Sequence, residues 1–330
     1  MQVLVTGGAG FIGSHYVRRL LQGAYPGFAG ARVIVLDKLT YAGTWENLAE
    51  VHGDPRLTLV HGDICDPATV AAVMRDVDTV LHFAAESHVD RSISGAADFV
   101  ATNVLGTQTL LAAAVACGVR KFVHVSTDEV YGSIDEDRWT ETRPLLPNSP
   151  YSASKAGADL LVGAFHRTYG LAVCITRCCN NYGPHQFPEK AVPLFVTNLL
   201  DGRKVPLYGD GTNVREWMHV DDHCAAVQLV AEHGVPGETY NVGGGTELSN
   251  LELTRRLLAA VGADWSSVEF VTDRPGHDRR YAVDTTKIRT ELGFVPRVPF
   301  EHGLAETVRW YRDNRRWWER ARLVAAGGHR

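Results

Sequence analysis

The sequence predicts an α/β fold, in which a doubly wound parallel sheet is followed by a smaller, mixed α/β domain toward the C-terminus. Short apolar runs alternate with helical patterns through the first half of the chain, and the first run ends in a glycine-rich turn. The 330 residues suffice for a large domain and a smaller one. We expect the first domain over residues 1–180, with the chain returning to it around 210–245, and the second mainly over 181–330.

Composition limits the possible partners. Hydrophobic content of 45% and charged content of 22% are ordinary for a globular protein, and the net charge of −5 argues against nucleic acid and anionic membranes. The six cysteines form neither a CxxC pair nor a zinc-type cluster with histidines, so we expect reduced thiols and no metal. We find no export signal and no apolar run long enough to span a bilayer, which predicts a cytoplasmic protein.

The first expected element is a short strand over residues 2–6, followed by the turn 7–13 and a helix. The turn has both GxGxxG and GxxGxxG spacing. Glycines let the backbone turn sharply and let a pyrophosphate approach it, and the following helix N-terminus supplies free N–H groups. A tight turn without a ligand can also use glycines. At the first strand–helix turn of an alternating chain, the motif predicts a Rossmann-type dinucleotide site.

The second expected strand, residues 32–37, ends in the carboxylate of Asp37. An acid at this position hydrogen-bonds the adenosine ribose hydroxyls and repels a 2′-phosphate. We therefore expect NAD rather than NADP as the cofactor. Lys38 follows directly and leaves NADP open as an alternative, because a base can accommodate the phosphate.

Three further strands and a helix complete the first half. The strands are expected at 57–64, 79–83 and 121–126, and the helix at 98–118. Asp63 and Ile64 end the first of these strands and would reach the adenine. Ala84 and Ala85 follow the second, and their small side chains would let the nicotinamide side of a cofactor pass.

The last of these strands leads into a hydroxyl and two adjacent carboxyls, Thr127, Asp128 and Glu129. Tyr151 and Lys155 begin the next helix, where their four-residue spacing puts both on one face. We expect the ammonium and a positively charged nicotinamide to lower the pKa of the Tyr151 phenol, which could then take a proton from a sugar hydroxyl while hydride leaves the same carbon. The two carboxyls would form a second acid–base pair. A solvated loop pair is the alternative, which their position directly after Thr127 disfavours.

These features resemble the extended short-chain dehydrogenase/reductase family over nearly the whole chain, and its nucleotide-sugar 4,6-dehydratases in particular. The stretches that carry the resemblance are 83–92, 126–132, 180–184, 187–190 and 273–278. The resemblance implies an NAD-retaining lyase of deoxysugar biosynthesis that converts dTDP-glucose to dTDP-4-keto-6-deoxyglucose. Tyr151 would be the base at the C4 hydroxyl, with Thr127 bonded to the same oxygen. Asp128 would be the acid at the C6 oxygen and Glu129 the base at C5.

The resemblance also implies two sets of binding residues. The expected NAD contacts are Gly7, Gly10, Phe11, Ile12, Gly13, Asp37, Lys38, Leu39, Thr40, Asp63, Ile64, Phe83, Ala84, Ala85, Ser87, Thr102, Tyr151, Lys155 and Asn181. The expected contacts to dTDP-glucose, or to a close nucleotide sugar, are Ser87, Arg91, Thr127, Asn180, Glu189, Lys190, Pro206, Tyr208, Arg215, Asn250, Arg274 and His277. Helices beginning at Asp98 and Tyr151 would build a homodimer through a four-helix bundle, although the same apolar faces could simply cover the sheet.

Two other functions fit part of the pattern. A nucleotide-sugar 4-epimerase on the same scaffold needs Thr127, Tyr151 and Lys155 but no adjacent acid–base pair, so Asp128 and Glu129 disfavour it. A non-catalytic NAD-binding regulatory protein would not need the redox residues together, so their presence disfavours that function.

The second half is expected to contain strands at 172–177, 205–208 and 238–242 and helices at 191–200, 221–232, 285–292 and 300–322, with another after Ser249. We interpret the aromatic residues Trp310, Tyr311, Trp317 and Trp318 as packing of the terminal helix. His185 and Ala191 depart from the family pattern at the expected edge of the substrate cleft.

Overall fold

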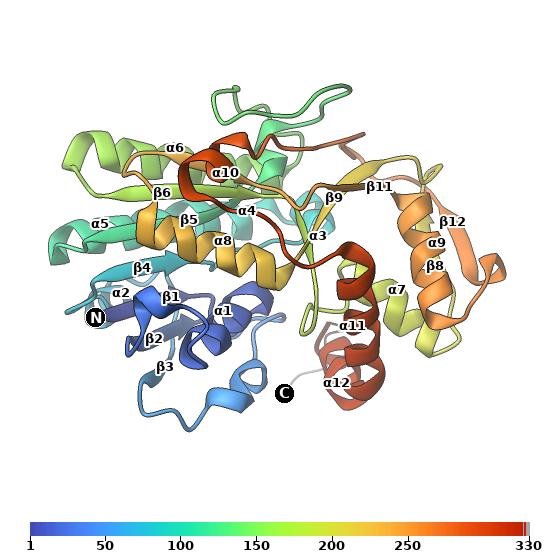
Figure 1. Cartoon of the computed structure of the whole chain (residues 1–330), viewed down its shortest axis with the longest axis horizontal. Helices are drawn as coiled ribbons and strands as arrows, with labels where there is room; N and C mark the ends of the chain where they lie inside the picture. Colours follow the sequence, from blue (N-terminus) through green and yellow to red (C-terminus); the bar gives the residue numbers. More distant parts are fainter. Residues whose placement is uncertain (326, 328–330) are drawn as a thin grey trace.

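The computed structural model describes residues 1–325 and 327. Its centre is a seven-stranded parallel sheet in the order β10-β6-β5-β4-β1-β2-β3 (Figure 1), which confirms the predicted fold class. The strands are β1 (Gln2–Thr6), β2 (Arg32–Asp37), β3 (Leu57–His61), β4 (Thr79–His82), β5 (Lys121–Thr127), β6 (Val173–Cys178) and β10 (Thr239–Val242). The winding direction reverses between β1 and β4, and ligands of such sheets bind in the crevice beyond the carboxyl ends of the strands at this point.

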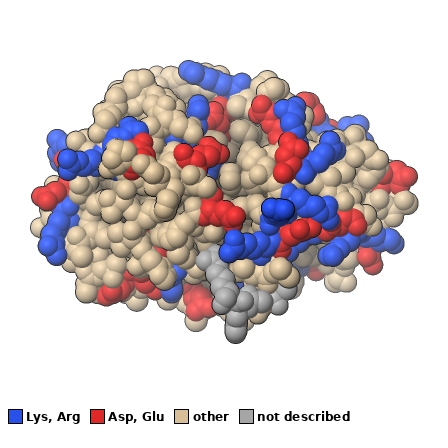
Figure 2. All heavy atoms as spheres, turned by 90° about the horizontal axis from the view of Figure 1, so that it is seen from below, with Lys and Arg blue, Asp and Glu red and all other residues tan. Residues whose placement is uncertain are grey.

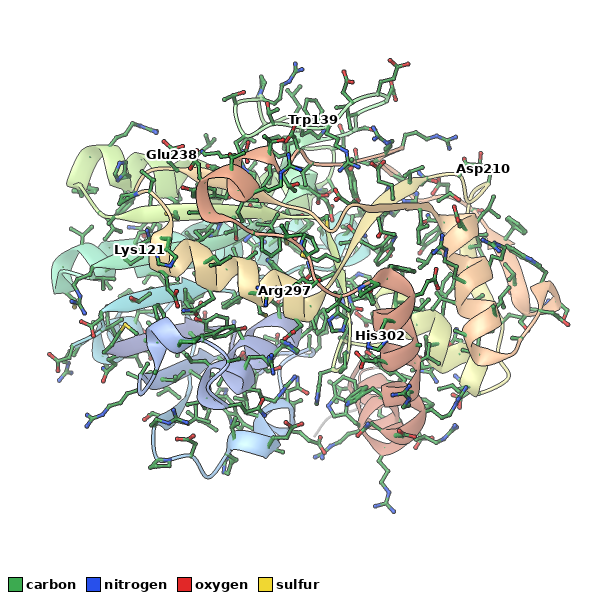
Figure 3. All side chains as sticks on the ribbon, in the orientation of Figure 1. Lys121, Trp139, Asp210, Glu238, Arg297 and His302 are labelled. Carbon is green, nitrogen blue, oxygen red and sulfur yellow. The ribbon has the colours of Figure 1, made fainter. Side chains whose placement is uncertain are left out.

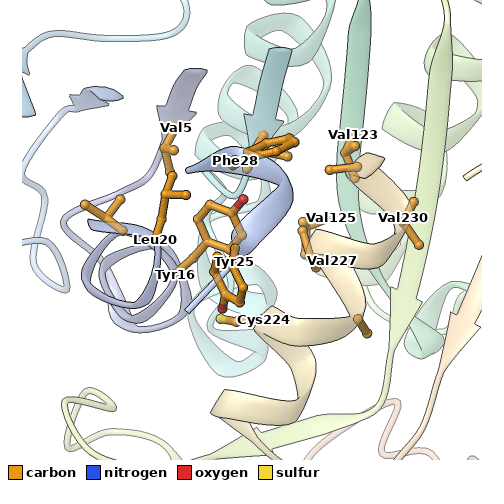
Figure 4. Close-up of a cluster of buried hydrophobic side chains, with 14 of the residues drawn as sticks. Val5, Tyr16, Leu20, Tyr25, Phe28, Val123, Val125, Cys224, Val227 and Val230 are labelled. Atoms are coloured by element: carbon orange, nitrogen blue, oxygen red, sulfur yellow. The ribbon is translucent and has the colours of Figure 1, made fainter. Parts of the chain in front are cut away.

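Helices cover both faces of the sheet, as a fully parallel sheet requires. One face carries α1 (Phe11–Leu21), α8 (Val220–His233) and α10 (Thr286–Leu292), and the other carries α2 (Pro67–Val73), α5 (Thr107–Cys117) and α6 (Pro150–Tyr169). Successive strand residues point to opposite faces, so Val3 and Val5 enter the first core and Leu4 the second. Figure 4 shows the first core, where side chains of α1 and α8 meet over the strands.

The helix predicted over 98–118 is divided in the structure. It consists of α4 (Ala96–Phe99), a π-helical stretch η3 (Val100–Gly106) and α5. In the π-helical stretch, the Asn103 side chain accepts from the Glu86 N–H at 2.9 Å, and it donates to the Glu86 carbonyl at 3.0 Å and to the Ser154 hydroxyl at 2.8 Å. The wider turn therefore ties this helix to the loop after β4 and to α6.

The same run, Ala96–Cys117, is the one helix of the described residues that is long and apolar enough to cross a membrane by length and composition alone. The prediction of no such apolar run was therefore wrong by this measure. Leu110, Leu111 and Ala114 of this run are fully buried in the second core. The apolar character of that side serves packing against the sheet.

The rest of the chain builds the C-terminal part. Its elements are β7 (Asn180–Tyr182), α7 (Ala191–Leu200), β8 (Val205–Tyr208), β9 (Val214–His219), β11 (Thr246–Ser249), α9 (Asn250–Val261), β12 (Val268–Val271), α11 (Phe300–Asp313) and α12 (Arg315–Ala325). Strands β11, β9 and β7 form one small sheet and β12 and β8 another. Shorter elements are η1 (Pro26–Phe28), η2 (Trp45–Val51), α3 (Val89–Ser94), η4 (Asp128–Tyr131) and η5 (Trp265–Ser267). The chain returns to the large sheet through α8 and β10, and the predicted domain boundary at residue 180 stays a prediction.

The terminal aromatic residues pack as predicted. Tyr311 and Trp318 are fully buried in the C-terminal core. His185 lies among them, with its ring centroid 4.4 Å from that of Trp310 and 5.6 Å from that of Trp317. Its expected place at the edge of the substrate cleft was therefore wrong.

The surface carries charges of both signs, and the long loop after η4 packs against the edge of the sheet. On the face shown in Figure 2, acidic and basic side chains are interspersed. Trp139, labelled in Figure 3, comes from the long loop after η4 and stacks on Tyr131 with 5.8 Å between ring centroids. Its carbonyl accepts from the Asn241 amide at 2.8 Å. These contacts hold the loop against β10, at the edge of the sheet.

Candidate active site

A cavity beyond the carboxyl ends of the sheet strands collects most of the predicted site. The predicted residues that line it are Gly7, Gly10, Phe11, Ile12, Gly13, Asp37, Lys38, Thr40, Asp63, Ile64, Phe83, Ala84, Ala85, Ser87, Thr102, Thr127, Glu129, Tyr151, Lys155, Asn180, Asn181, Glu189 and Lys190. The sequence did not predict Tyr41, Glu86, Cys178, Gln186, Phe187 and Trp217, which line it too. Glu86 and Phe187 lie in stretches that carry the family resemblance, which could have marked them, whereas the other four residues carry no pattern that marks them as ligand contacts.

The glycine turn fits a dinucleotide. Gly7 has φ +69°, and a Cβ on it would lie 2.6 Å from the Ala84 Cα. A Cβ on Gly13 would lie 2.3 Å from the Gly7 carbonyl oxygen. Helix α1 starts immediately after Gly10, so its first N–H groups lack intrahelical partners and face the cavity end of the sheet. These positions require glycine, and together they form a cradle suited to a pyrophosphate.

Asp37 is fixed at the end of β2. Its carboxylate accepts from the Ala9 N–H at 2.9 Å and from the Leu39 N–H at 2.8 Å. Lys38 turns away to pair with Asp63 at 2.7 Å. The carboxylate thus keeps lone pairs for ribose hydroxyls, while the nearest base is engaged elsewhere, so the residues fit NAD. Within the described residues the cavity lining does not include Leu39, which instead positions Asp37 through its backbone.

Helix α6 holds the two residues predicted for the redox step. It starts with a capping box, in which the Ser149 and Ser152 hydroxyls each accept from the other residue's N–H at 3.1 Å. Pro150 occupies the first turn, where its missing N–H has no cost. The sequence therefore starts the helix one residue before Tyr151, and both Tyr151 and Lys155 line the cavity.

Lys155 is almost completely buried. Its ammonium donates to the Val125 carbonyl at 2.8 Å. Burial lowers the pKa of Lys155 to about 8, and the neighbouring Asp159 carboxylate opposes that shift. An ammonium has three N–H donors, so Lys155 can also bind a nicotinamide ribose.

Tyr151 does not show the lowered pKa that the sequence predicts. Burial raises the pKa of Tyr151 well above its ordinary value, and the Glu129 carboxylate adds to the increase. A hydrogen bond with Thr127 acts in the opposite direction. The groups of the chain alone therefore raise this pKa through the cost of a buried phenolate, whereas the predicted lowering also counted the charge of a bound nicotinamide and stays a prediction.

Asp128 and Glu129 stand in different surroundings although they are adjacent. Asp128 is 1% exposed, and its Oδ2 has no hydrogen-bond partner among the described residues. Burial raises the pKa of Asp128 well above its ordinary value, and Glu129 raises it further. Burial also raises the pKa of Glu129, but nearby positive side chains, Arg274 first and then Lys190, oppose this shift. Asp128 is therefore suited to hold a proton, and Glu129 to accept one.

The predicted catalytic residue Asp128 and several predicted substrate residues lie outside the cavity lining of the described residues; the latter are Arg91, Pro206, Tyr208, Arg215, Asn250, Arg274 and His277. Tyr208 and Arg274 both reach the Asp90 carboxylate at 3.4 Å, and the His277 ring lies 6.2 Å from the Tyr208 ring. The structure thus brings Tyr208, Arg274 and His277 together around Asp90.

The other predicted residues have different neighbours. Arg91 pairs with Glu189 and lies 3.9 Å over the Tyr41 ring. Arg215 lies 4.0 Å over the Tyr281 ring. Pro206 is part of β8, and Asn250 begins α9.

Comparison with known proteins gives three findings. The sequence model of the family described as GDP-mannose 4,6 dehydratase matches residues 4–307. A dTDP-glucose 4,6-dehydratase of Streptomyces antibioticus is 62% identical over 328 residues, which cover 99% of this chain and 97% of that protein. The crystal structure of DesIV (dTDP-glucose 4,6-dehydratase) from Streptomyces venezuelae with NAD and TYD bound has 65% identity and a TM-score of 0.97, and the match covers 97% of this chain and 100% of that chain.

An enzyme with a different activity matches less closely. The structure of a UDP-glucose 4-epimerase from Thermotoga maritima with UDP-glucose has 34% identity and a TM-score of 0.87, and the match covers 95% of this chain and 99% of that chain. The overall fold is therefore shared between dehydratases and epimerases, and only particular residues can separate the two.

Proposed function

The chain belongs to the GDP-mannose 4,6-dehydratase family, and from this premise we propose that it is an NAD-dependent lyase that converts dTDP-glucose to dTDP-4-keto-6-deoxyglucose. The observation that carries the proposal is the adjacent pair of the buried Asp128 and the half-buried Glu129, directly after Thr127 and close to Tyr151. A 4-epimerase has no use for this second acid–base pair.

The first step is oxidation at C4. Tyr151 takes the proton of the C4 hydroxyl, and Thr127 bonds the same oxygen from the end of β5. NAD held by the glycine turn and Asp37 would supply the acceptor for the C4 hydride and the donor of that hydride to C6. Lys155, with a pKa of about 8, is mainly protonated at neutral pH and stabilises the phenolate electrostatically.

The second step is elimination of water across C5 and C6. The C4 ketone acidifies the C5 proton, which Glu129 removes. The C6 hydroxyl leaves as water only if it receives a proton, and Asp128 holds one because its buried carboxyl ionises with difficulty. Glu129 then returns its proton to C5 as hydride adds to C6, and two carboxyls with separated pKa values can perform these transfers within one site.

We also propose how the nucleotide sugar is held. Arg274, Lys190 and Arg215 all act on the Glu129 carboxylate and so place positive charge beside the sugar site, where a diphosphate would bind. The Tyr208 and His277 rings lie 6.2 Å apart near Arg274 and suit the flat face of a pyrimidine.

The proposal extends to assembly and location. Val100, Leu105 and Leu160 lie on neighbouring helical segments and are 54%, 52% and 64% exposed. We propose that this face, named here the apolar helix face, pairs with a second copy to form a homodimer through a four-helix bundle. All six cysteines are free thiols, which supports a cytoplasmic location.

One assay tests the activity. The purified protein is incubated with dTDP-glucose without added cofactor, and the 4-keto-6-deoxy product is followed by its absorbance in alkali. We expect product to form, because NAD is regenerated in each turnover. Absence of product from protein that demonstrably carries NAD would contradict the proposal, and UDP-glucose in a parallel reaction measures the preference for the base.

A further inference from the structure

Asn47 joins three segments that are distant in the sequence. This residue of η2 is 1% exposed. Its side-chain amide donates to the Ala9 carbonyl at 2.8 Å. Its side-chain oxygen accepts from the Trp317 indole N–H at 2.9 Å and from the His185 ring at 3.3 Å. One side chain therefore links the glycine turn, the loop after β7 and helix α12.

The orientation of this amide is determined by its partners. The indole of Trp317 can only donate a hydrogen bond, and the Ala9 carbonyl can only accept one. Exchanging the oxygen and nitrogen of Asn47 would therefore place two donors together at Trp317 and two acceptors together at Ala9. Burial lowers the pKa of His185 to about 3, so its ring stays neutral. Because the Asn47 side-chain oxygen can only accept, the His185 Nδ1 that faces it carries the proton and donates. All three bonds thus depend on the same arrangement.

The Ala9 end of this link belongs to the cofactor cradle. The Ala9 carbonyl also accepts from the Thr44 N–H at 3.1 Å, so two donors define the direction of this peptide group. The Ala9 N–H donates to the Asp37 carboxylate at 2.9 Å. The next residue, Gly10, is the N-cap of α1. Any shift of Ala9 would move both the start of α1 and the carboxylate expected to bind ribose.

The Trp317 end belongs to the C-terminal core. Trp317 lies 5.1 Å from Trp310 and 6.4 Å from Tyr311 between ring centroids, and the Tyr311 hydroxyl donates to the Gln186 carbonyl. Gln186 lines the cavity and donates to the Asn181 carbonyl at 2.8 Å. Trp317 is therefore linked to the glycine turn through Asn47, and its neighbour Tyr311 contacts the loop that lines the cavity.

From these contacts we infer that Asn47 and Trp317 are positioning residues for NAD: the indole N–H holds the Asn47 amide, and the amide holds the glycine turn in its cofactor-binding form. Retention of NAD then depends on a hydrogen bond from a residue 270 positions away in the sequence. This inference rests on the NAD site of the proposed function but not on the identity of the sugar.

The test compares Trp317→Phe with Trp318→Phe. Both variants remove one indole N–H from α12 and keep an aromatic ring. The Trp318 N–H donates to the Tyr311 carbonyl at 2.7 Å and does not reach Asn47, and its ring is fully buried. The holoenzyme is mixed with isotope-labelled NAD, and exchange of the bound cofactor is followed by mass spectrometry. We expect Trp317→Phe to exchange NAD about 2- to 10-fold faster than the wild type, as loss of one hydrogen bond implies, and Trp318→Phe to exchange at the wild-type rate.

A double variant tests whether the two residues act through each other. Asn47→Asp keeps the acceptors for Trp317 but replaces the donor to Ala9 by a carboxylate, so it should exchange NAD faster than Trp317→Phe. Adding Trp317→Phe to Asn47→Asp should then cause little further increase, because the link to Ala9 is already broken.

The outcomes are distinct. Equal exchange rates in the two tryptophan variants, or independent and multiplicative effects in the double variant, would overturn the inference and leave Trp317 as a packing residue. Melting temperatures measured in parallel show whether faster NAD exchange merely follows lower stability. Because Trp318 is fully buried, Trp318→Phe should lower the melting temperature more than Trp317→Phe does. A wild-type protein that binds no NAD would contradict the proposed function instead.

Discussion

At the residue scale, the adjacent carboxyls of Asp128 and Glu129 have different surroundings, and the proposed chemistry depends on that difference. Asp128 is enclosed with a second carboxylate beside it, whereas Glu129 lies within reach of the positive charges of Arg274 and Lys190. The sequence places the two acids side by side. It could not show which of them would be near the basic residues, because those come from segments about 60 and 145 positions further along the chain.

Asp128→Asn should separate oxidation from elimination. The amide keeps the size of the carboxyl but cannot protonate the C6 hydroxyl, so dehydration should fall by about 10²-fold or more while hydride transfer from C4 continues. Rapid-mixing absorbance should then show NADH accumulating on the enzyme after addition of dTDP-glucose. Glu129→Gln should show the same pattern.

Asp135→Asn is the matched control, because this exposed acid lies a few residues further along the same stretch of chain. It should dehydrate at the wild-type rate. If Asp128→Asn and Glu129→Gln also dehydrate at that rate, the assignment of acid and base is wrong.

Lys155 should leave a signature in the pH dependence of stability. Its pKa in the folded protein is about 8, below the ordinary value of 10.5. Between these two pH values the unfolded chain holds a proton that the folded protein has lost, so the free energy of unfolding should rise with pH. The full change is of the order of 3 kcal/mol.

The measurement is urea unfolding of the wild type and of Lys155→Met from pH 7.5 to about 10.5. The difference between the two free energies of unfolding should move in favour of the wild type as pH rises, because methionine cannot titrate. A difference that is constant over this range would show that Lys155 has an ordinary pKa in the folded protein.

At the element scale, the start of α6 sets the position of Tyr151. Ser149, Pro150 and Ser152 together form an N-terminal signal that is readable from the sequence, although the prediction above rests on the spacing of Tyr151 and Lys155. The π-helical stretch η3 was not predictable in the same way. Its apolar pattern is that of an ordinary helix, and the wider turn follows from the contacts of Asn103 with Glu86 and Ser154.

Ser149→Ala should weaken both stability and catalysis. Loss of the cap should lower the free energy of unfolding by about 1 kcal/mol, and a loosened first turn should displace the Tyr151 phenol and reduce NADH formation from C4. Urea unfolding and single-turnover kinetics measure the two effects separately.

Asp66→Ala provides the comparison, because Asp66 caps α2, which carries none of the predicted site residues. It should cost similar stability with little effect on the rate of C4 oxidation. Equal effects of both variants on that rate would mean that the cap of α6 has no special role in positioning Tyr151.

At the scale of the whole molecule, the apolar helix face of Val100, Leu105 and Leu160 stays exposed when one chain folds. Residues Leu110 and Leu111 on the same helical run are buried against the sheet, so the two sides of the run serve different purposes. The sequence could not distinguish these sides with certainty, since both are apolar.

Leu160→Glu should convert the proposed dimer to a monomer, because a charge buried in a four-helix bundle without a partner is unfavourable. Leu146→Glu is the control, since Leu146 is 63% exposed, nearly the same as Leu160, but lies in the long loop before α6. Sedimentation velocity should show loss of the dimer for Leu160→Glu alone. A dimer that persists in Leu160→Glu would place the interface elsewhere.

The sequence by itself determined the parts of this protein that depend on short-range patterns. The alternation of apolar runs and helical segments predicts the parallel sheet, and the glycine spacing predicts the NAD turn. The four-residue spacing of Tyr151 and Lys155 places them on one helix face, and the apolar run before Thr127 places that residue at a strand end. Only the tertiary structure decided which charges surround Glu129, how far burial raises the pKa of Tyr151, and that Trp317 reaches Asn47. The reason is physical: local backbone preferences act over a few residues, whereas desolvation and charge interactions depend on groups that only folding brings together.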